Sequence, residues 1–199
     1  MFVTVTLLSV EALTLYRGSR KLAADLSFGL DAGTALHLRG SNGVGKTTLL
    51  EVLSGLRRVE EGQVSQRPDS SQLHWLGHKN ALNLSLTPQE NLEFWCGLHA
   101  VDASGISAAL ENLGVSRVRH RPCRTLSAGQ KRRTALARLL LSPRKLWLLD
   151  EPLDGLDAQG LALFADLLNQ HLQLGGAAVI TSHQPLPVGV MSVRELQLQ

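Results

Sequence analysis

The chain has 199 residues, of which 44% are hydrophobic and 19% charged, and a formal net charge of +3. These values indicate one globular domain and exclude both a disordered chain and two full domains. No apolar run approaches the roughly 20 residues of a membrane-spanning helix, so we expect that the chain does not cross a bilayer by itself.

The chain opens on an apolar segment, MFVTVTLLSV. It has no basic residues in front of the apolar run and no convincing small-residue cleavage site, which argues against a signal peptide. The alternation of Val3, Val5 and Leu7 predicts a half-buried strand instead. Cys96 and Cys123 form neither a disulfide framework nor a metal-binding pattern, so a reducing, cytoplasmic setting is expected.

Strand-like and helix-like segments alternate along the chain. Strands are predicted at about residues 2–8, 35–39, 73–77, 145–150 and 177–181. Helices are predicted at about 46–54, 88–97, 104–113, 127–141 and 158–174. This order favours an α/β domain over residues 1–199 with a mostly parallel, doubly wound sheet, and we expect an antiparallel part near the N-terminus. The wholly helical stretch from about 78 to 143 predicts an inserted helical subdomain.

Residues 40 to 48, GSNGVGKTT, carry the pattern G-x-x-x-x-G-K-T between a predicted strand and a predicted helix. Glycines let successive backbone N–H groups point inward at phosphate oxygens, and the start of the helix adds to this anion site. The lysine of such a loop reaches the β- and γ-phosphates, and the threonine hydroxyl joins the Mg²⁺ shell. The sequence therefore predicts a nucleoside triphosphate site, and a glycine-rich turn with a chance lysine is the alternative. The expected binding residues are Gly40, Ser41, Asn42, Gly43, Val44, Gly45, Lys46, Thr47 and Thr48.

Two carboxylates, Asp150 and Glu151, close a continuous apolar run that is typical of a buried parallel strand. Ligands bind outside the carboxyl ends of such strands, where the phosphate loop and His183 are also expected. We expect Asp150 to bind Mg²⁺, through water, and Glu151 to act as general base for a hydrolytic water. Pro152 predicts an extended Glu151, so that the two acids point to opposite sides. The alternative is a pair of acids that merely faces solvent.

Residues 126 to 130, LSAGQ, open the predicted helix 127–141 with a capping box formed by Ser127 and Gln130. Basic residues crowd around this segment, which indicates either a nucleic-acid surface or a face that meets solvent, phosphates or an acidic loop of a partner. The basic residues are Arg117, Arg119, Arg121, Arg124, Lys131, Arg132, Arg133 and Arg138.

Residues 126 to 130 resemble the LSGGQ signature of ATP-binding-cassette (ABC) ATPases, with an alanine in place of one glycine. The order of the motifs is also similar to that family: phosphate loop, signature, Asp150-Glu151, a loop with Asp154 and Asp157 that resembles the D-loop, and His183, which resembles the switch histidine. The resemblance spans nearly the whole chain. It implies the fold of a phosphate-loop ATPase of the ABC type, with ATP and Mg²⁺ as cofactors.

The resemblance also implies roles for single residues. Tyr16 looks like the aromatic residue that stacks on adenine, with core packing as the alternative. His183 would be catalytic beside Glu151, contacting the γ-phosphate and holding the attacking water, with a structural histidine as the alternative. Two copies of such a cassette pair head to tail, an arrangement that is isologous by symmetry. The signature residues Ser127, Ala128, Gly129 and Gln130 would then touch ATP held by the other copy.

One position departs from the family pattern, because His78 and Lys79 stand where most cassettes carry a glutamine that serves Mg²⁺ and coupling. Together with the short length and with Ser182-His183-Gln184-Pro185-Leu186, this departure resembles the ATP-binding subunits of bacterial haem exporters in cytochrome c biogenesis. That resemblance implies a Mg-dependent ATPase at the cytoplasmic face of the inner membrane, with integral membrane subunits of a haem-handling complex as partners. Binding of nucleic acid or of haem itself is not expected.

Three other functions stay open at this point. The nearest is the ATPase subunit of another ABC exporter. A soluble DNA-associated ABC ATPase would use the basic segment, although such proteins usually carry long coiled-coil insertions or tandem cassettes. A small-molecule kinase would use the phosphate loop and leave the segment 126–130 without a role.

Overall fold

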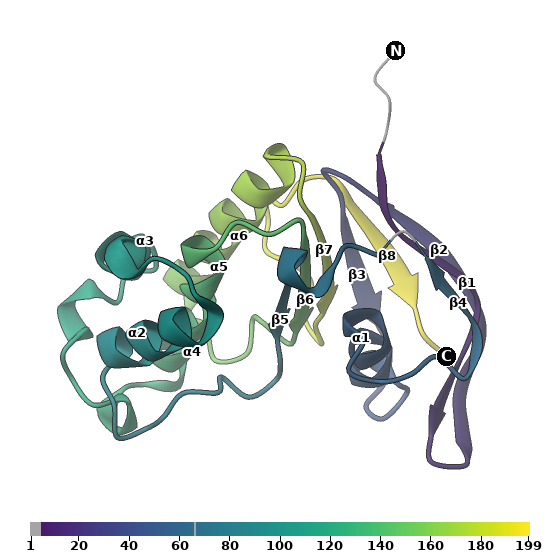
Figure 1. Ribbon diagram of the computed structural model, residues 1–199, viewed down its shortest axis with the longest axis horizontal. Helices are drawn as coiled ribbons and strands as arrows, with labels where there is room; N and C mark the ends of the chain where they lie inside the picture. Colours follow the sequence, from purple (N-terminus) through teal and green to yellow (C-terminus); the bar gives the residue numbers. More distant parts are fainter. Residues whose placement is uncertain (1–4, 66) are drawn as a thin grey trace.

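The computed structural model describes residues 5–65 and 67–199, and these residues form two sheets with helices around them (Figure 1). In the described residues the larger sheet is parallel throughout, with the strand order β5-β6-β7-β3-β8. Its strands are β3 (Ala35–Arg39), β5 (Leu73–Leu76), β6 (Leu146–Asp150), β7 (Ala177–Thr181) and β8 (Val193–Gln197). The predicted α/β class with a mostly parallel sheet is confirmed.

The parallel sheet is buried on both faces, and successive residues of β6 show how. Trp147 and Leu149 belong to one apolar cluster, whereas Leu146 and Leu148 belong to another, because neighbouring side chains of a strand point to opposite faces. Helix α6 (Ala158–Gln173) packs in the first cluster and helix α1 (Lys46–Ser54) in the second. A strand covered on both faces reads as a continuous apolar run, which is why the sequence predicted it.

The smaller sheet is antiparallel and lies at the N-terminal side, as expected. It consists, in the described residues, of β1 (Thr6–Arg17), β2 (Arg20–Asp31) and β4 (Glu61–Ser65), in the order β2-β1-β4. Of these strands the sequence predicted only the start of β1, and residues 2–4 of that prediction lie outside the described residues. Left-handed backbone at Ala12 and Asp25 and several register shifts interrupt the alternation that would have revealed the hairpin.

Helices α2 (Pro88–His99), α3 (Ile106–Asn112), α4 (Ala128–Leu136) and α5 (Arg138–Leu141) gather beside the parallel sheet (Figure 1). The predicted helix 127–141 is interrupted at Ala137, between α4 and α5. Leu92, Leu110 and Leu136 share one apolar cluster with Trp147 of the sheet, so the apolar core of these helices is continuous with that of the sheet. Short 3₁₀ turns occur at Ser70–Gln72, Ala103–Gly105, Ser116–Val118 and Cys123–Thr125.

The limits of the inserted subdomain, about 78 to 143, stay a prediction. Among the helices of residues 5–65 and 67–199, none is long and apolar enough to cross a membrane.

Candidate functional site

The loop 40–45 leads from β3 into α1 and has the backbone that the glycine pattern predicts. Gly40, Gly43 and Gly45 have φ angles of 152°, 80° and 118°, a region that favours glycine. A Cβ atom on Gly40 would lie 2.8 Å from Cγ1 of Val44 and 2.9 Å from the carbonyl oxygen of Leu198. Helix α1 begins at Lys46, as predicted, and its first N–H groups point toward the loop without a side-chain cap, which suits an anion.

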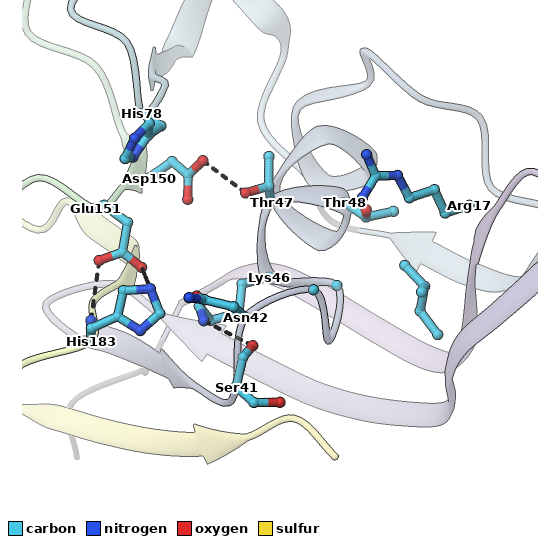
Figure 2. Close-up of a pocket in the computed structure, with 13 residues that line it drawn as sticks. Arg17, Ser41, Asn42, Lys46, Thr47, Thr48, His78, Asp150, Glu151 and His183 are labelled. Carbon is cyan, nitrogen blue, oxygen red and sulfur yellow. Dashed lines mark hydrogen bonds and ion pairs between the residues drawn. The ribbon is translucent and has the colours of Figure 1, made fainter.

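Lys46 lies over this loop and is almost buried, with 8% of the residue exposed. Its Nζ donates to the carbonyl oxygens of Gly40, at 2.7 Å, and Ser41, at 3.3 Å. The ammonium group is thereby held at the mouth of the loop, next to the place where phosphate oxygens would lie. Figure 2 shows Lys46 between the loop residues and the carboxylates.

Asp150 joins the loop to the ends of two strands. Its Oδ2 accepts a hydrogen bond from Oγ1 of Thr47, at 2.9 Å (Figure 2). Its Oδ1 accepts one from Oγ1 of Thr181, at 2.7 Å. Asp150 and Thr181 pair directly across β6 and β7, which explains why the second contact forms. A carboxylate beside a hydroxyl fits Mg²⁺, which prefers oxygen ligands and takes few of them from the protein when phosphates supply others.

Glu151 differs from the sequence-based expectation, because its φ angle is 48° and its backbone is left-handed rather than extended. Pro152 acts against the right-handed helical region but does not by itself select the extended one. The hydrogen bonds around the turn decide: the Glu151 N–H donates to Oγ1 of Thr181 at 2.9 Å, and the Glu151 carbonyl accepts from Arg132 at 2.6 Å. The predicted extended conformation of Glu151 was wrong.

The Glu151 carboxylate faces His183 (Figure 2). Its Oε2 accepts from the backbone N–H of His183 at 3.1 Å, and its Oε1 lies 3.4 Å from Nε2 of the same histidine. Oε1 is buried and has no hydrogen-bond partner among the described residues. A buried acceptor without a partner is costly, so this oxygen is suited to receive a proton or a hydrogen bond from a small molecule in the cavity.

These groups line one cavity of about 270 Å³. The structure brings most of the predicted residues together there, namely Ser41, Asn42, Gly43, Gly45, Lys46, Thr47, Thr48, His78, Asp150, Glu151 and His183. Gly40 and Val44 belong to the same loop but do not line the cavity. Lys79 is exposed and lies outside the lining, so of the two residues at the departing position only His78 faces the cavity.

Arg17 and Leu22 also line the cavity, and sequence reasoning missed both. They flank the turn between β1 and β2, so only recognition of that hairpin would have placed them. Tyr16 is not among the described lining residues. Its hydroxyl donates to Oε1 of Glu61 at 2.7 Å, and this hydrogen bond raises the pKa of Tyr16. The adenine-stacking role of Tyr16 stays a prediction.

The segment 126–130 lies outside this cavity. Ser127 caps α4 by accepting from the N–H of Gln130 at 3.1 Å, and Oε1 of Gln130 accepts from the N–H of Ser127 at 3.0 Å, which confirms the capping box. Ser127 and Ala128 are exposed. A Cβ on Gly129 would lie 2.7 Å from the carbonyl oxygen of Gly155, so this end of α4 packs directly on the loop 154–157.

The two aspartates of the loop 154–157 have different contacts. Oδ1 of Asp157 accepts from the N–H of Gly160 at 2.8 Å and caps α6. Oδ2 of Asp154 lies 3.7 Å from Nδ1 of His78, which connects this loop with the rim of the cavity.

The basic segment does not form a single face. Arg132 and Arg133 are buried, and Arg138 is partly buried and donates to the carbonyls of Asn80 and Ala81. Arg117, Arg121 and Arg124 are exposed. Part of the positive charge therefore has an internal structural use, which weakens the nucleic-acid interpretation.

Comparisons with known proteins support one family. The family model of ABC transporters matches residues 23–154. A cytochrome c biogenesis ATP-binding export protein from Rhodobacter capsulatus is 44% identical over 194 residues, which are 98% of this chain and 88% of that protein. Proteins of the same name from Paracoccus denitrificans and Gluconobacter oxydans are 44% and 43% identical and cover 96% of this chain and 90% and 87% of their own lengths.

Solved structures agree on the fold. A Pyrococcus furiosus protein described as an ABC transporter ATP-binding protein superposes with a TM-score of 0.81 at 21% identity, covering 95% of this chain and 96% of its own. The ATP-binding subunit of another ABC transporter superposes with a TM-score of 0.79 at 22% identity, covering 89% of this chain and 79% of its own.

Proposed function

The chain belongs to the ABC transporter family, and from this membership we propose that it is the ATP-hydrolysing subunit of a membrane complex that exports or handles haem during c-type cytochrome biogenesis. The observation that carries the hydrolytic part is the cavity in which a phosphate loop faces a buried carboxylate with an unpartnered oxygen. The haem-related part rests on the relatives, which are named as export proteins of cytochrome c biogenesis over nearly the whole chain.

ATP would lie in the cavity with its phosphates on the loop and its base toward Arg17 and Leu22, which line the cavity. The loop N–H groups and Lys46 would bind the β- and γ-phosphates. Thr47 and Asp150 are the residues that would hold Mg²⁺, Asp150 through water, and the ion would neutralise charge on the phosphate oxygens when bound.

Glu151 would serve as the general base. Its unpartnered Oε1 is buried and adjoins the imidazole of His183, so it can take a proton from a water placed beside the γ-phosphate. His183 would keep that water in line, and His78 is the cavity residue that would take over the role of the glutamine found in most cassettes. The Glu151→Gln substitution tests the proposed role of Glu151.

A second copy of the chain is the proposed partner at the signature. Ser127 and Ala128 are exposed and lie outside the chain's own cavity, as expected of residues that bind ATP held elsewhere. Gly129 and Gln130 share this helix end, and the loop with Asp154 and Asp157 packs beside it. We propose that ATP between two copies forms part of their interface and that hydrolysis loosens it.

The remaining partners would be integral membrane subunits, which would place the chain at the cytoplasmic face of the inner membrane. Copurification from native membranes, with identification of the bound integral proteins, tests this proposal. Subunits of a haem-handling complex are expected, and deletion of the chain should abolish c-type cytochromes. Partners that belong to a sugar, lipid or peptide exporter would exclude the haem proposal and leave the ATPase proposal standing.

A further inference from the structure

Arg132 is a buried cation one turn into α4, with 2% of the residue exposed. Two of its nitrogens hold the turn that carries the carboxylates. Nη2 donates to the backbone carbonyls of Asp150, at 2.8 Å, and Glu151, at 2.6 Å, and Nε donates to the carbonyl of Pro152 at 3.1 Å. The guanidinium therefore fixes three consecutive peptide units at the end of β6.

The third nitrogen holds a different segment of the chain. Nη1 donates to Oδ1 of Asn80 at 2.9 Å and to the carbonyl of Gly77 at 3.2 Å, with the carbonyl of His78 at 3.5 Å. This segment carries the His78 side chain that lines the cavity. One side chain thus connects α4, the carboxylate turn and the 77–80 segment.

The arrangement of these hydrogen-bond acceptors requires an arginine, and another cation would not serve. A guanidinium presents five N–H donors in a planar fork, whereas a lysine presents its three donors from a single point and cannot span these acceptors. Burial lowers the pKa of Arg132 to about 10, which still leaves the group charged at neutral pH. A buried charge is retained only where it is fully hydrogen-bonded, and here every nitrogen of the side chain is used.

The hydrogen bond from Arg132 to the Glu151 carbonyl is made to a residue with an unfavourable backbone conformation. A left-handed backbone is unfavourable for a glutamate and persists only when the surroundings over-determine it. Thr181 holds the Glu151 N–H and Arg132 holds the Glu151 carbonyl, so the conformation is fixed from both sides. Without the second contact the turn can relax to an extended form, which would redirect the carboxylate.

We propose that Arg132 is a positioning residue for ATP hydrolysis, which aims the Glu151 carboxylate into the cavity and keeps the His78 segment in register with α4. The inference rests on the proposed function, in which Glu151 is the general base. It assigns Arg132 no contact with the nucleotide, since Arg132 lies outside the cavity lining. Because the capped end of α4 would meet the second copy, Arg132 also connects that interface with the general base.

Arg132→Lys is the variant that tests this role, since it keeps the charge and removes the fork. We expect kcat for ATP hydrolysis to fall on the order of 10²-fold, the usual effect of a small misplacement of a reacting group, with KM and the calorimetric affinity for ATP nearly unchanged. Arg138→Lys is the matched control: Arg138 donates to Asn80 and Ala81 of the same segment but makes no contact with the carboxylate turn in the described residues. Its kcat should stay close to that of the wild type.

A double-mutant cycle separates positioning from general destabilisation. If Arg132 acts through Glu151, then Arg132→Lys should add little further loss of kcat in a Glu151→Gln background. Full additivity of the two losses, or a wild-type kcat in Arg132→Lys, would overturn the inference. A Glu151→Gln variant with wild-type turnover would instead overturn the proposed role of Glu151, so the two failures are distinguishable.

A second variant covers the case in which Arg132→Lys does not fold. Arg132→Gly leaves a space shaped for the missing guanidinium, and added guanidinium at low concentration should restore kcat while ammonium should not. Folding is checked by thermal unfolding before and after addition. A folded Arg132→Gly variant with low kcat and no response to guanidinium would contradict the proposal.

Discussion

The two ends of the cavity are built differently. The phosphate end rests on α1 and on the ends of β6 and β7, and its side chains are nearly buried, with 8% of Lys46, 2% of Asp150 and 6% of Glu151 exposed. The opposite end rests on the β1–β2 hairpin, where Arg17 is exposed and Leu22 partly exposed. The difference teaches that the proposed phosphate site is built from buried side chains anchored on the core, whereas the proposed site of the base is formed by more exposed side chains of a hairpin.

The largest effect is expected at the phosphate end, from Glu151→Gln. If Glu151 is the base, as proposed, its removal should lower kcat by about 10² to 10⁴-fold. Affinity for ATP should change little, because the amide keeps the size of the side chain and the phosphate loop is intact. Steady-state hydrolysis and calorimetry check the two quantities. Asp166→Asn, at an exposed position of α6, is the control that should retain activity.

Lys46→Ala should act on binding rather than on turnover alone. A hydrogen bond to a charged group contributes about 1.5 to 3 kcal/mol, so the dissociation constant for ATP should rise by roughly 10- to 100-fold. Lys145→Ala removes an exposed lysine outside the cavity lining and should leave the constant unchanged. Calorimetry that finds the same ATP affinity for Lys46→Ala and the wild type would contradict the placement of phosphates on the loop.

A smaller effect is expected at the hairpin end. Arg17 lines the cavity and can lie over an adenine ring, an interaction of about 0.5 to 2 kcal/mol, so Arg17→Ala should weaken ATP binding by only that amount. Tyr16→Ala tests the predicted stacking of Tyr16, and we expect its effect to be the smaller of the two because the hydroxyl is tied to Glu61. GTP should bind nearly as well as ATP. Strong discrimination against GTP would contradict this expectation, because it would require specific contacts between the hairpin end and the base.

The smallest effect is spectroscopic. Tyr16 is the only tyrosine in the chain, so the ultraviolet titration of phenolate reports on it alone. Its hydrogen bond to Glu61 raises the pKa of Tyr16 above the ordinary value, and Glu61→Gln should lower the titration midpoint. A midpoint unchanged by this substitution would show that the hydrogen bond is absent in solution.

The difference between buried and exposed elements also explains which strands could be predicted from the sequence. Strands β3, β6 and β7 are buried on both faces, so their apolar runs are visible in the sequence. Asp150 ends β6, Glu151 follows it, and His183 lies two residues beyond β7. The strands β2, β4 and β8 were missed. In β2 the irregular register hides the alternation, and β4 (EGQVS) and β8 (VRELQ) are mostly exposed edge strands in which polar residues are tolerated.

The meeting of the phosphate loop, the carboxylates and His183 was predicted, but the individual side-chain contacts that shape the site were not. The left-handed Glu151 depends on Thr181 and Arg132, which lie in other elements, and local rules for the residue before proline pointed the other way. Arg17 was hidden because its hairpin was not recognised. The phosphate loop was predictable because its pattern lies in consecutive residues, whereas the conformation of Glu151, the proposed general base, depends on contacts with distant elements.

The common apolar cluster of Leu92, Leu110, Leu136 and Trp147 limits how the molecule can deform. A hinge between the helices and the sheet would need a boundary with few side-chain contacts. The apolar cluster instead crosses this boundary, and protein interiors are close-packed. A large rotation of the helices would expose this apolar cluster to water, whereas a small tilt would keep it buried. Amide hydrogens along α4 and β6 should then exchange together and slowly, as one cooperative unit.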